Sequence, residues 1–133
     1  MSNILKISDA CSLALHSAVF LANNPGKLFS TGDISKKIHV SEAHLSKVLQ
    51  LLAKNGIVKS IRGPKGGFSL AKIPENISLL DIYEIIEGPF TKTKCLLEKQ
   101  VCKNNRCIFG NLLSLSEKQF KDYMKKSKLK DFC

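Results

Sequence analysis

Leu49–Leu70, with the sequence LQLLAKNGIVKSIRGPKGGFSL, is typical of the end of a helix, a short strand, a tight basic turn and a second strand. The segment KNG at 54–56 supplies a basic last turn and a glycine stop for the helix. Strand-forming residues follow at 57–61 and again at 68–70. The turn between them, RGPKGG at 62–67, has three glycines that let its backbone approach a partner closely, and two cations that favour a negative partner. This order of helix, strand and cationic hairpin indicates a winged helix-turn-helix.

The composition indicates one domain with a polyanionic partner. The 133 residues include 21 Lys and Arg against 11 Asp and Glu, a formal charge of +10, which favours nucleic acid or an anionic membrane surface as the partner. The charge is not gathered along one amphipathic helix, which argues against a membrane.

No segment is apolar for long enough to span a bilayer, and the N-terminus lacks a signal-peptide pattern, so we expect a cytoplasmic protein. Five cysteines in that compartment favour metal or redox use over disulfides.

The residues before the opening stretch predict three helices. The first runs from about Asn3 to Asn23 and has apolar residues on both faces, a pattern typical of a helix that meets its own core and a second subunit. Ser30 and Asp33 form a predicted capping box for a short helix that ends at Ile38. Ser41 is the predicted cap of the next helix. Two short helices joined by a tight turn are typical of a helix-turn-helix.

The helix after Ser41 has an apolar side and a polar side. The opposite, polar side could be a solvated face, as most such faces are, but the basic hairpin that follows favours contact with DNA. Small residues near its start would let it lie deep in a major groove. The inward residues are Leu45, Val48, Leu49 and Leu52, and the opposite side has Ala43, Ser46, Lys47, Gln50 and Lys54, with His44 at its margin.

The second half of the chain predicts two more helices around a loop that contains cysteines. Ser78 caps a helix over Leu79–Glu87, which Gly88 and Pro89 end. From 107 to about 126 the apolar residues cover an arc wider than one small core requires, so we interpret this segment as a dimerisation helix, followed by a frayed basic tail. The predicted organisation is a DNA-binding domain (1–89), a cysteine-bearing loop (90–107) and a dimerisation helix with its tail (108–133). The fold class is mostly α with a small β wing.

The loop presents Cys95-x6-Cys102-x4-Cys107, three thiols within thirteen positions. Thiolates are the ligands that iron–sulfur clusters require. Structural zinc fits the same spacing, and reduced thiols without a metal are a third reading. Of the other cysteines, Cys11 lies on the core face as a small apolar filler, and Cys133 is interpreted as incidental.

RGPKGG at 62–67, with NGIVKSI before it and ISLLDIYEIIEGP after it, resembles the Rrf2 family of bacterial transcriptional regulators, in its iron–sulfur-sensing branch. The resemblance covers most of the chain. It implies a homodimer that binds palindromic double-stranded promoter DNA, with the last helix crossing to the partner subunit. It also implies that Arg62 enters the minor groove, where a narrow groove concentrates negative potential. The implied base-reading residues are Ala43, His44, Ser46 and Lys47, and the implied phosphate contacts are Lys36, Lys54, Lys59 and Lys65.

The resemblance also favours an iron–sulfur cluster, [2Fe–2S] or [4Fe–4S], because sensing members have three cysteines in this loop and members without a cluster generally lack the set. A fourth ligand is needed, and here the chain departs from its relatives. Gly110 stands where one branch has a histidine, and Ser12 stands where another has an aspartate supplied by the partner subunit. His16 matches a histidine of a redox-sensing branch. The leading candidate is therefore His16 from the second subunit, with Asp9 and Ser12 behind it.

These features together predict a homodimeric DNA-binding regulator whose affinity for promoters is gated by the cluster. The alternative is a winged-helix regulator whose cysteines hold zinc or nothing. An enzyme has little support, because the sequence offers neither a substrate-pocket motif nor a nucleophile–base set. The glycines of RGPKGG lie in a hairpin tip, which is the wrong context for nucleotide binding. We therefore expect no small-molecule substrate and no membrane partner.

Overall fold

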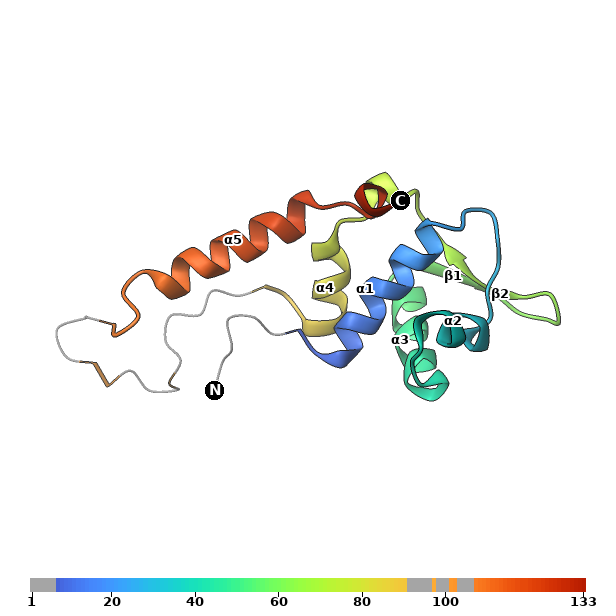
Figure 1. The fold of residues 1–133 in the computed structure, drawn as a ribbon, viewed down its shortest axis with the longest axis horizontal. Helices are drawn as coiled ribbons and strands as arrows, with labels where there is room; N and C mark the ends of the chain where they lie inside the picture. Colours follow the sequence, from blue (N-terminus) through green and yellow to red (C-terminus); the bar gives the residue numbers. More distant parts are fainter. Residues whose placement is uncertain (1–6, 91–96, 98–100, 103–106) are drawn as a thin grey trace.

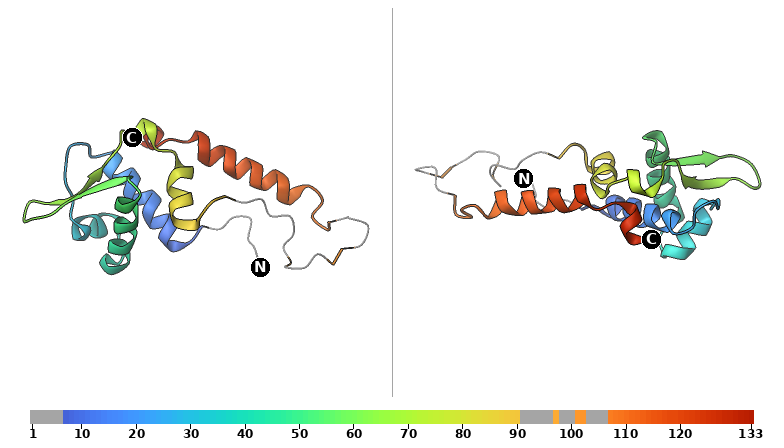
Figure 2. Two further views of the ribbon diagram at one scale, coloured as in Figure 1. Left: turned by 180° about the vertical axis from the view of Figure 1, so that it is seen from behind. Right: turned by 90° about the horizontal axis from the view of Figure 1, so that it is seen from above.

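The computed structural model describes residues 7–90, 97, 101–102 and 107–133. Helices α1 to α4 and the wing form one body, and α5 extends away from it as an arm (Figures 1 and 2). No helix within the described ranges is both long and apolar enough to cross a membrane. The elements are α1 (Asp9–Ala22), α2 (Thr31–Ile38), α3 (Glu42–Lys54), β1 (Val58–Ile61), β2 (Gly67–Leu70), η1 (Pro74–Asn76), α4 (Leu79–Glu87), α5 (Leu112–Lys126) and η3 (Leu129–Phe132).

The predicted helix-turn-helix is confirmed, because its caps form as expected. Ser30 Oγ accepts a hydrogen bond from Asp33 N at 3.0 Å, and the Asp33 carboxylate accepts one from Ser30 N at 3.1 Å. These hydrogen bonds lower the pKa of Asp33, since they stabilise its charged form. His39 ends α2 in the left-handed conformation, at φ 58°, and Ser41 Oγ accepts from His44 N to start α3. The turn between the two helices is therefore fixed at both ends.

The wing is an antiparallel hairpin in which Val58 pairs with Leu70 and Ile61 with Gly67. Phe29, which precedes α2, adds a bridge to the outer strand: its N–H donates to Phe68 O at 3.1 Å, and its carbonyl accepts from Phe68 N at 2.7 Å. The wing is thus hydrogen-bonded to the segment that leads into the helix-turn-helix.

The core lies between α1, α3 and α4, and the predicted inward side of α3 is confirmed. Small residues of α1, Ala14 and Ala18, are fully buried and allow its neighbours to approach closely. The largest fully buried side chains from the other elements include Ile34, Leu45, Leu49, Leu52, Ile77, Ile82 and Leu129.

Two predicted helix starts are wrong. The first helix begins at Asp9 instead of Asn3, because Ser8 is extended and its Oγ accepts from Cys11 N at 3.1 Å, which makes it the cap. The last helix begins at Leu112 instead of residue 107. Gly110 adopts φ 56°, and its N–H bonds to Cys107 O in a turn that separates the cysteine from the helix.

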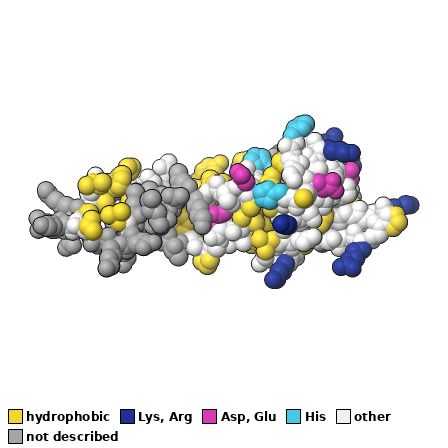
Figure 3. Space-filling view, turned by 90° about the horizontal axis from the view of Figure 1, so that it is seen from below, with side chains coloured by type: hydrophobic (Ala, Val, Ile, Leu, Met, Phe, Trp, Pro, Cys, Tyr) yellow, Lys and Arg dark blue, Asp and Glu magenta, His cyan; other side chains and the backbone are white. Residues whose placement is uncertain are grey.

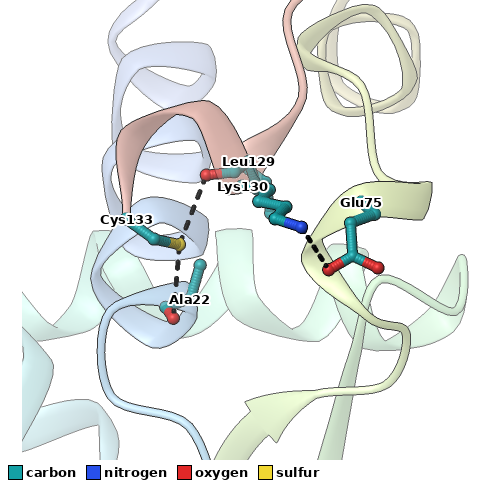
Figure 4. Close-up of polar contacts among 5 residues, drawn as sticks. All are labelled: Ala22, Glu75, Leu129, Lys130 and Cys133. Atoms are coloured by element: carbon teal, nitrogen blue, oxygen red, sulfur yellow. Dashed lines mark hydrogen bonds and ion pairs between the residues drawn. The ribbon is translucent and has the colours of Figure 1, made fainter.

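The predicted frayed tail is also wrong, since the residues after α5 dock onto the body. Leu129 is fully buried, and its N–H donates to Ile77 O at 3.0 Å. In Figure 4, Cys133 Sγ lies 3.5 Å from Ala22 O, and Lys130 forms an ion pair with Glu75 at 3.2 Å. A single leucine therefore anchors the far end of α5 against α1 and η1.

We expect Leu129→Ala to lower the free energy of unfolding by about 2–4 kcal/mol, because it leaves a cavity in a fully buried site. Urea unfolding followed by circular dichroism measures this. Lys130→Ala is the matched control. It removes an ion pair whose side chains are both more than half exposed, at 64% and 51%, so it should cost less than about 1 kcal/mol. Equal losses in the two variants would contradict the assigned anchor.

Candidate nucleic-acid interface and cysteine centre

The outer face of α3 is free for a partner. Ala43, His44 and Lys47 are exposed, and Ser46 is half-buried beside them. Gln50 Nε2 donates to Ser46 Oγ at 3.3 Å, which holds the serine oxygen in place and leaves its hydroxyl hydrogen available to an acceptor. This surface combines a small side chain, hydrogen-bonding groups and one cation, which suits the edges of base pairs in a groove.

The tip of the wing, which projects from the same body as α3, carries two cations (Figure 1). Arg62 and Lys65 are exposed on the turn between β1 and β2, and Gly66 N bonds to Gly63 O at 2.9 Å to close it. Figure 3 shows Lys and Arg side chains at the hairpin end of the molecule and histidines over the helical body on the same face. The other cations predicted to contact phosphate, Lys36, Lys54 and Lys59, are likewise exposed.

The wing glycines have a role that the sequence reasoning missed. An added Cβ at Gly66 would lie 1.9 Å from Ile61 O, and one at Gly67 would lie 2.7 Å from the backbone of Phe29. Both glycines are therefore required by the chain's own backbone, whereas the sequence reasoning attributed the turn's freedom to a partner's approach. Gly63 has open space around it but adopts φ 114°. In the sequence, the adjacent pair Gly66-Gly67 was the signal from which this steric role could have been predicted.

The predicted cysteine ligands are only partly described by the structure. Cys95 lies outside the described residues. Cys102 is a half-buried free thiol and Cys107 an exposed one, and Cys107 Sγ accepts a hydrogen bond from Phe109 N at 3.4 Å. Among the described residues no group of three or more His, Cys, Asp or Glu side chains is close enough to hold a metal ion.

His16 is presented on the surface of α1 with one nitrogen already engaged. Its Nδ1 lies 2.7 Å from Ser12 O and 3.3 Å from Ser12 Oγ. Because a carbonyl oxygen can only accept, Nδ1 is the donor in this contact, and Nε2 is the ring nitrogen left for an external ligand. Asp9 is exposed one turn before Ser12. The ring of His16 is therefore oriented by Ser12 on the exposed side of α1.

Cys11 does not fit a ligand role, as predicted. It is fully buried, and burial, with a smaller contribution from the nearby Glu87 carboxylate, raises the pKa of its thiol to about 11. It therefore stays a neutral thiol at neutral pH.

Ser8 Oγ donates to Glu87 Oε1 at 2.5 Å. This hydrogen bond connects the start of α1 to the end of α4.

An aromatic cluster connects α4, the start of the loop and α5. The rings of Tyr83 and Phe120 lie 5.3 Å apart, and those of Phe90 and Phe120 lie 5.9 Å apart and stacked. Phe90 N also donates to the Glu84 carboxylate at 3.2 Å. The sequence reasoning had placed Phe90 in an irregular segment and missed this contact. The residue at which the cysteine-bearing loop begins is thus fixed to both flanking helices.

Comparison with known proteins gives a consistent result. The family described as "Rrf2: Iron-dependent Transcriptional regulator" matches residues 7–133. A helix-turn-helix transcriptional regulator of Aquifex aeolicus is 35% identical over 127 residues, which are 93% of this chain and 88% of the relative. The regulator NsrR of Bacillus licheniformis is 31% identical over 112 residues, 84% of this chain and 76% of NsrR.

Solved structures agree on the fold. CymR, the global cysteine regulator of B. subtilis, is 28% identical and superposes with a TM-score of 0.80, covering 96% of this chain and 95% of CymR. IscR of T. potens is 24% identical with a TM-score of 0.73, covering 96% and 85% of the two chains. At that identity the likeness to IscR bears on the fold alone.

Proposed function

The chain belongs to the Rrf2 family of transcriptional regulators, and we propose that it is a homodimer whose promoter binding is controlled by an iron–sulfur cluster. The relatives are regulators and not enzymes. The observation that carries the DNA-binding part is the exposed polar face of α3 together with the exposed cationic tip at 62–67. The division into 1–89 for DNA, 90–107 for the cluster and 108–133 for the dimer follows from this proposal.

In this proposal α3 lies in the major groove and the wing in the adjacent minor groove. Ala43, His44, Ser46 and Lys47 read base edges, and Arg62 enters the minor groove. The exposed lysines neutralise phosphates and release counterions, which supplies affinity without sequence preference. These phosphate contacts are Lys36, Lys54, Lys59 and Lys65.

The proposed dimer uses α5 and the turn before it. Ile108, Leu112, Leu115 and Tyr123 are 88%, 56%, 63% and 58% exposed. Several large apolar side chains exposed along one segment are typical of a surface that a second copy of the same chain covers. A two-fold dimer would present two α3 helices to the two halves of a palindromic site.

In this proposal, residues of the loop and of α1 hold the iron–sulfur cluster. Cys102 and Cys107 are free thiols, and the N–H···S bond from Phe109 is of the kind that stabilises a thiolate. We assign Cys95, Cys102 and Cys107 as the thiolate ligands and the partner's His16 as the fourth ligand, through the free Nε2. The iron dependence in the family's description supports this set. When bound, the cluster supplies a centre whose charge and ligation respond to oxidants and to nitric oxide.

The chain's own contacts suggest how the state of the loop reaches the DNA. The loop begins at Phe90, which is stacked on Phe120 of α5 and hydrogen-bonded to Glu84 of α4. A shift of the loop would therefore turn α5 relative to α4, and so turn one subunit relative to the other. Two recognition helices must be one helical turn of DNA apart, so a small rotation weakens binding.

We expect His44→Ala and Lys36→Gln to affect DNA binding differently. His44→Ala should weaken binding to the cognate promoter more than to unrelated DNA, because it removes a base contact worth about 1–3 kcal/mol. Lys36→Gln should weaken both equally and reduce the salt slope by about 1. Fluorescence anisotropy across a salt series measures both effects, with the exposed Lys130→Gln as the control. Identical behaviour of His44→Ala and Lys36→Gln would contradict the assigned roles.

A regulator whose cysteines hold zinc or no metal is the second candidate. It is supported by the likeness to CymR, the global cysteine regulator of B. subtilis, at 28% identity and a TM-score of 0.80. Visible absorption and electron paramagnetic resonance spectra of anaerobically purified protein distinguish the two candidates. A coloured protein whose spectrum responds to oxidant or nitric oxide supports the cluster, and a colourless protein rejects it.

A further inference from the structure

A groove separates the wing from the connection between α1 and α2. It has a volume of about 510 Å³, and it is lined by residues of that connection, by the outer face of the β-hairpin and by 71–74 after the wing. The connection runs past β1 and β2 in Figure 1. Lys59, Ile61 and Ser69 line it from the strands, on the side of the sheet opposite buried Val58. Leu21 and Ala22 of the hydrophobic core line its inner end, so the groove opens from the edge of the core to the surface.

The apolar lining of the groove is unusually exposed for large aliphatic side chains. Leu28, Ile61 and Ile73 are 37%, 46% and 55% exposed, and all three line this groove. They come from three separate segments that converge here. Gathered apolar groups with a polar rim are typical of a site that binds a partner.

The charges at the rim are all of one sign. Lys27, Lys59 and Lys72 line the groove, and none of its described lining residues is acidic. All three lysines are exposed. An apolar floor with a cationic rim complements a molecule that has an apolar body and one carboxylate.

We propose that this groove binds a small amphipathic carboxylate from solution, with its hydrocarbon body against Leu28, Ile61 and Ile73 and its carboxylate at Lys27 and Lys72. The volume is within the range of small-molecule sites, about 300–1,000 Å³. Lys59 lines this groove and is also one of the phosphate contacts proposed above, so the groove borders the proposed DNA-binding surface. The binding itself does not depend on the proposed regulation, and can be tested without DNA.

The test uses the full chain and octanoate, titrated by calorimetry and by ¹H–¹⁵N correlation spectra. We expect saturable binding, with shifts confined to 21–28, 59–61 and 69–74. Each buried methylene contributes about 0.8 kcal/mol, so hexanoate should bind roughly tenfold more weakly. Octylammonium, which has the opposite charge, should not bind.

Paired variants separate the groove from the rest of the surface. Ile73→Glu should abolish binding, whereas Ile7→Glu, at a residue of similar exposure (53% against 55%) outside the groove, should not. Lys72→Gln should weaken binding about three- to fivefold, as expected for one exposed ion pair, and Lys37→Gln on α2 should leave it unchanged. Spectra of the free variants verify that each is folded.

Three results would overturn the proposal. One is the absence of saturable binding. A second is binding that neither Ile73→Glu nor Lys72→Gln reduces. The third is association with anionic vesicles in place of free octanoate, which would identify a lipid surface as the partner.

Discussion

Replacing Gly66 with alanine should open the wing and strongly weaken DNA binding. The new Cβ would lie 1.9 Å from Ile61 O and under 3 Å from the backbone of Arg62, so the strands must separate. We expect a loss of about 2–4 kcal/mol in stability and at least about a tenfold loss in affinity for a promoter, because Arg62 is displaced from the minor groove.

Gly63→Ala is the matched control for this prediction, because it lies in the same turn. Its added Cβ meets nothing within 4 Å, but it must adopt φ 114°, which costs about 1 kcal/mol. Urea unfolding and fluorescence anisotropy measure the two effects for both variants. If Gly63→Ala were as harmful as Gly66→Ala, backbone strain alone would explain the loss, and the steric role assigned to Gly66 would be wrong.

The second large effect is expected from Cys107→Ala. In the proposed ligand set it removes one of three thiolates, so the anaerobically purified variant should lose its visible absorption and its response to oxidant and nitric oxide. The exposed Cys133→Ala is the control, since this residue is not in the set, and it should keep both. His16→Ala should retain a cluster with an altered resonance spectrum, because one ligand of four is replaced.

DNA binding by the same variants tests the gating separately from the metal. Cys107→Ala should bind a promoter with an affinity that no longer changes between reduced and oxidised conditions. A variant that keeps the wild-type spectrum would reject Cys107 as a ligand. A variant that loses the spectrum but keeps a redox-dependent affinity would support Cys107 as a ligand and reject the gating.

Helix ends with a local chemical cause could be predicted from the sequence. The capping boxes at Ser30 and Ser78 both form with Asp three residues later, as expected. The hairpin was predictable because glycines and cations gather at 62–67 between strand-forming residues. The start at Ser8 was missed because the apolar periodicity continues to Ile4 in the sequence, and periodicity alone does not identify which serine caps.

Contacts between distant segments could not be predicted in the same way. The tail from Lys125 is polar and basic, and only Leu129 in it provides an apolar anchor, so its docking depends on a pocket built from α1 and η1. The same holds for the stacking of Phe90 on Phe120, which are 30 positions apart. For the cysteine site, spacing alone indicated candidate ligands, whereas a ligand set shared between subunits depends on an assembly that one sequence does not specify.

The burial of Leu129 has a mechanical consequence for α5. The helix has 15 residues, about 22 Å at 1.5 Å per residue, and it is clamped at its C-terminal end by Leu129 and at Phe120 by the aromatic cluster. Its N-terminal end, at Leu112, extends beyond both contacts, on the side of Cys107. A displacement of that end must therefore bend the helix or loosen the packing at Phe120 or Leu129, so a change near Cys107 is felt at both contacts.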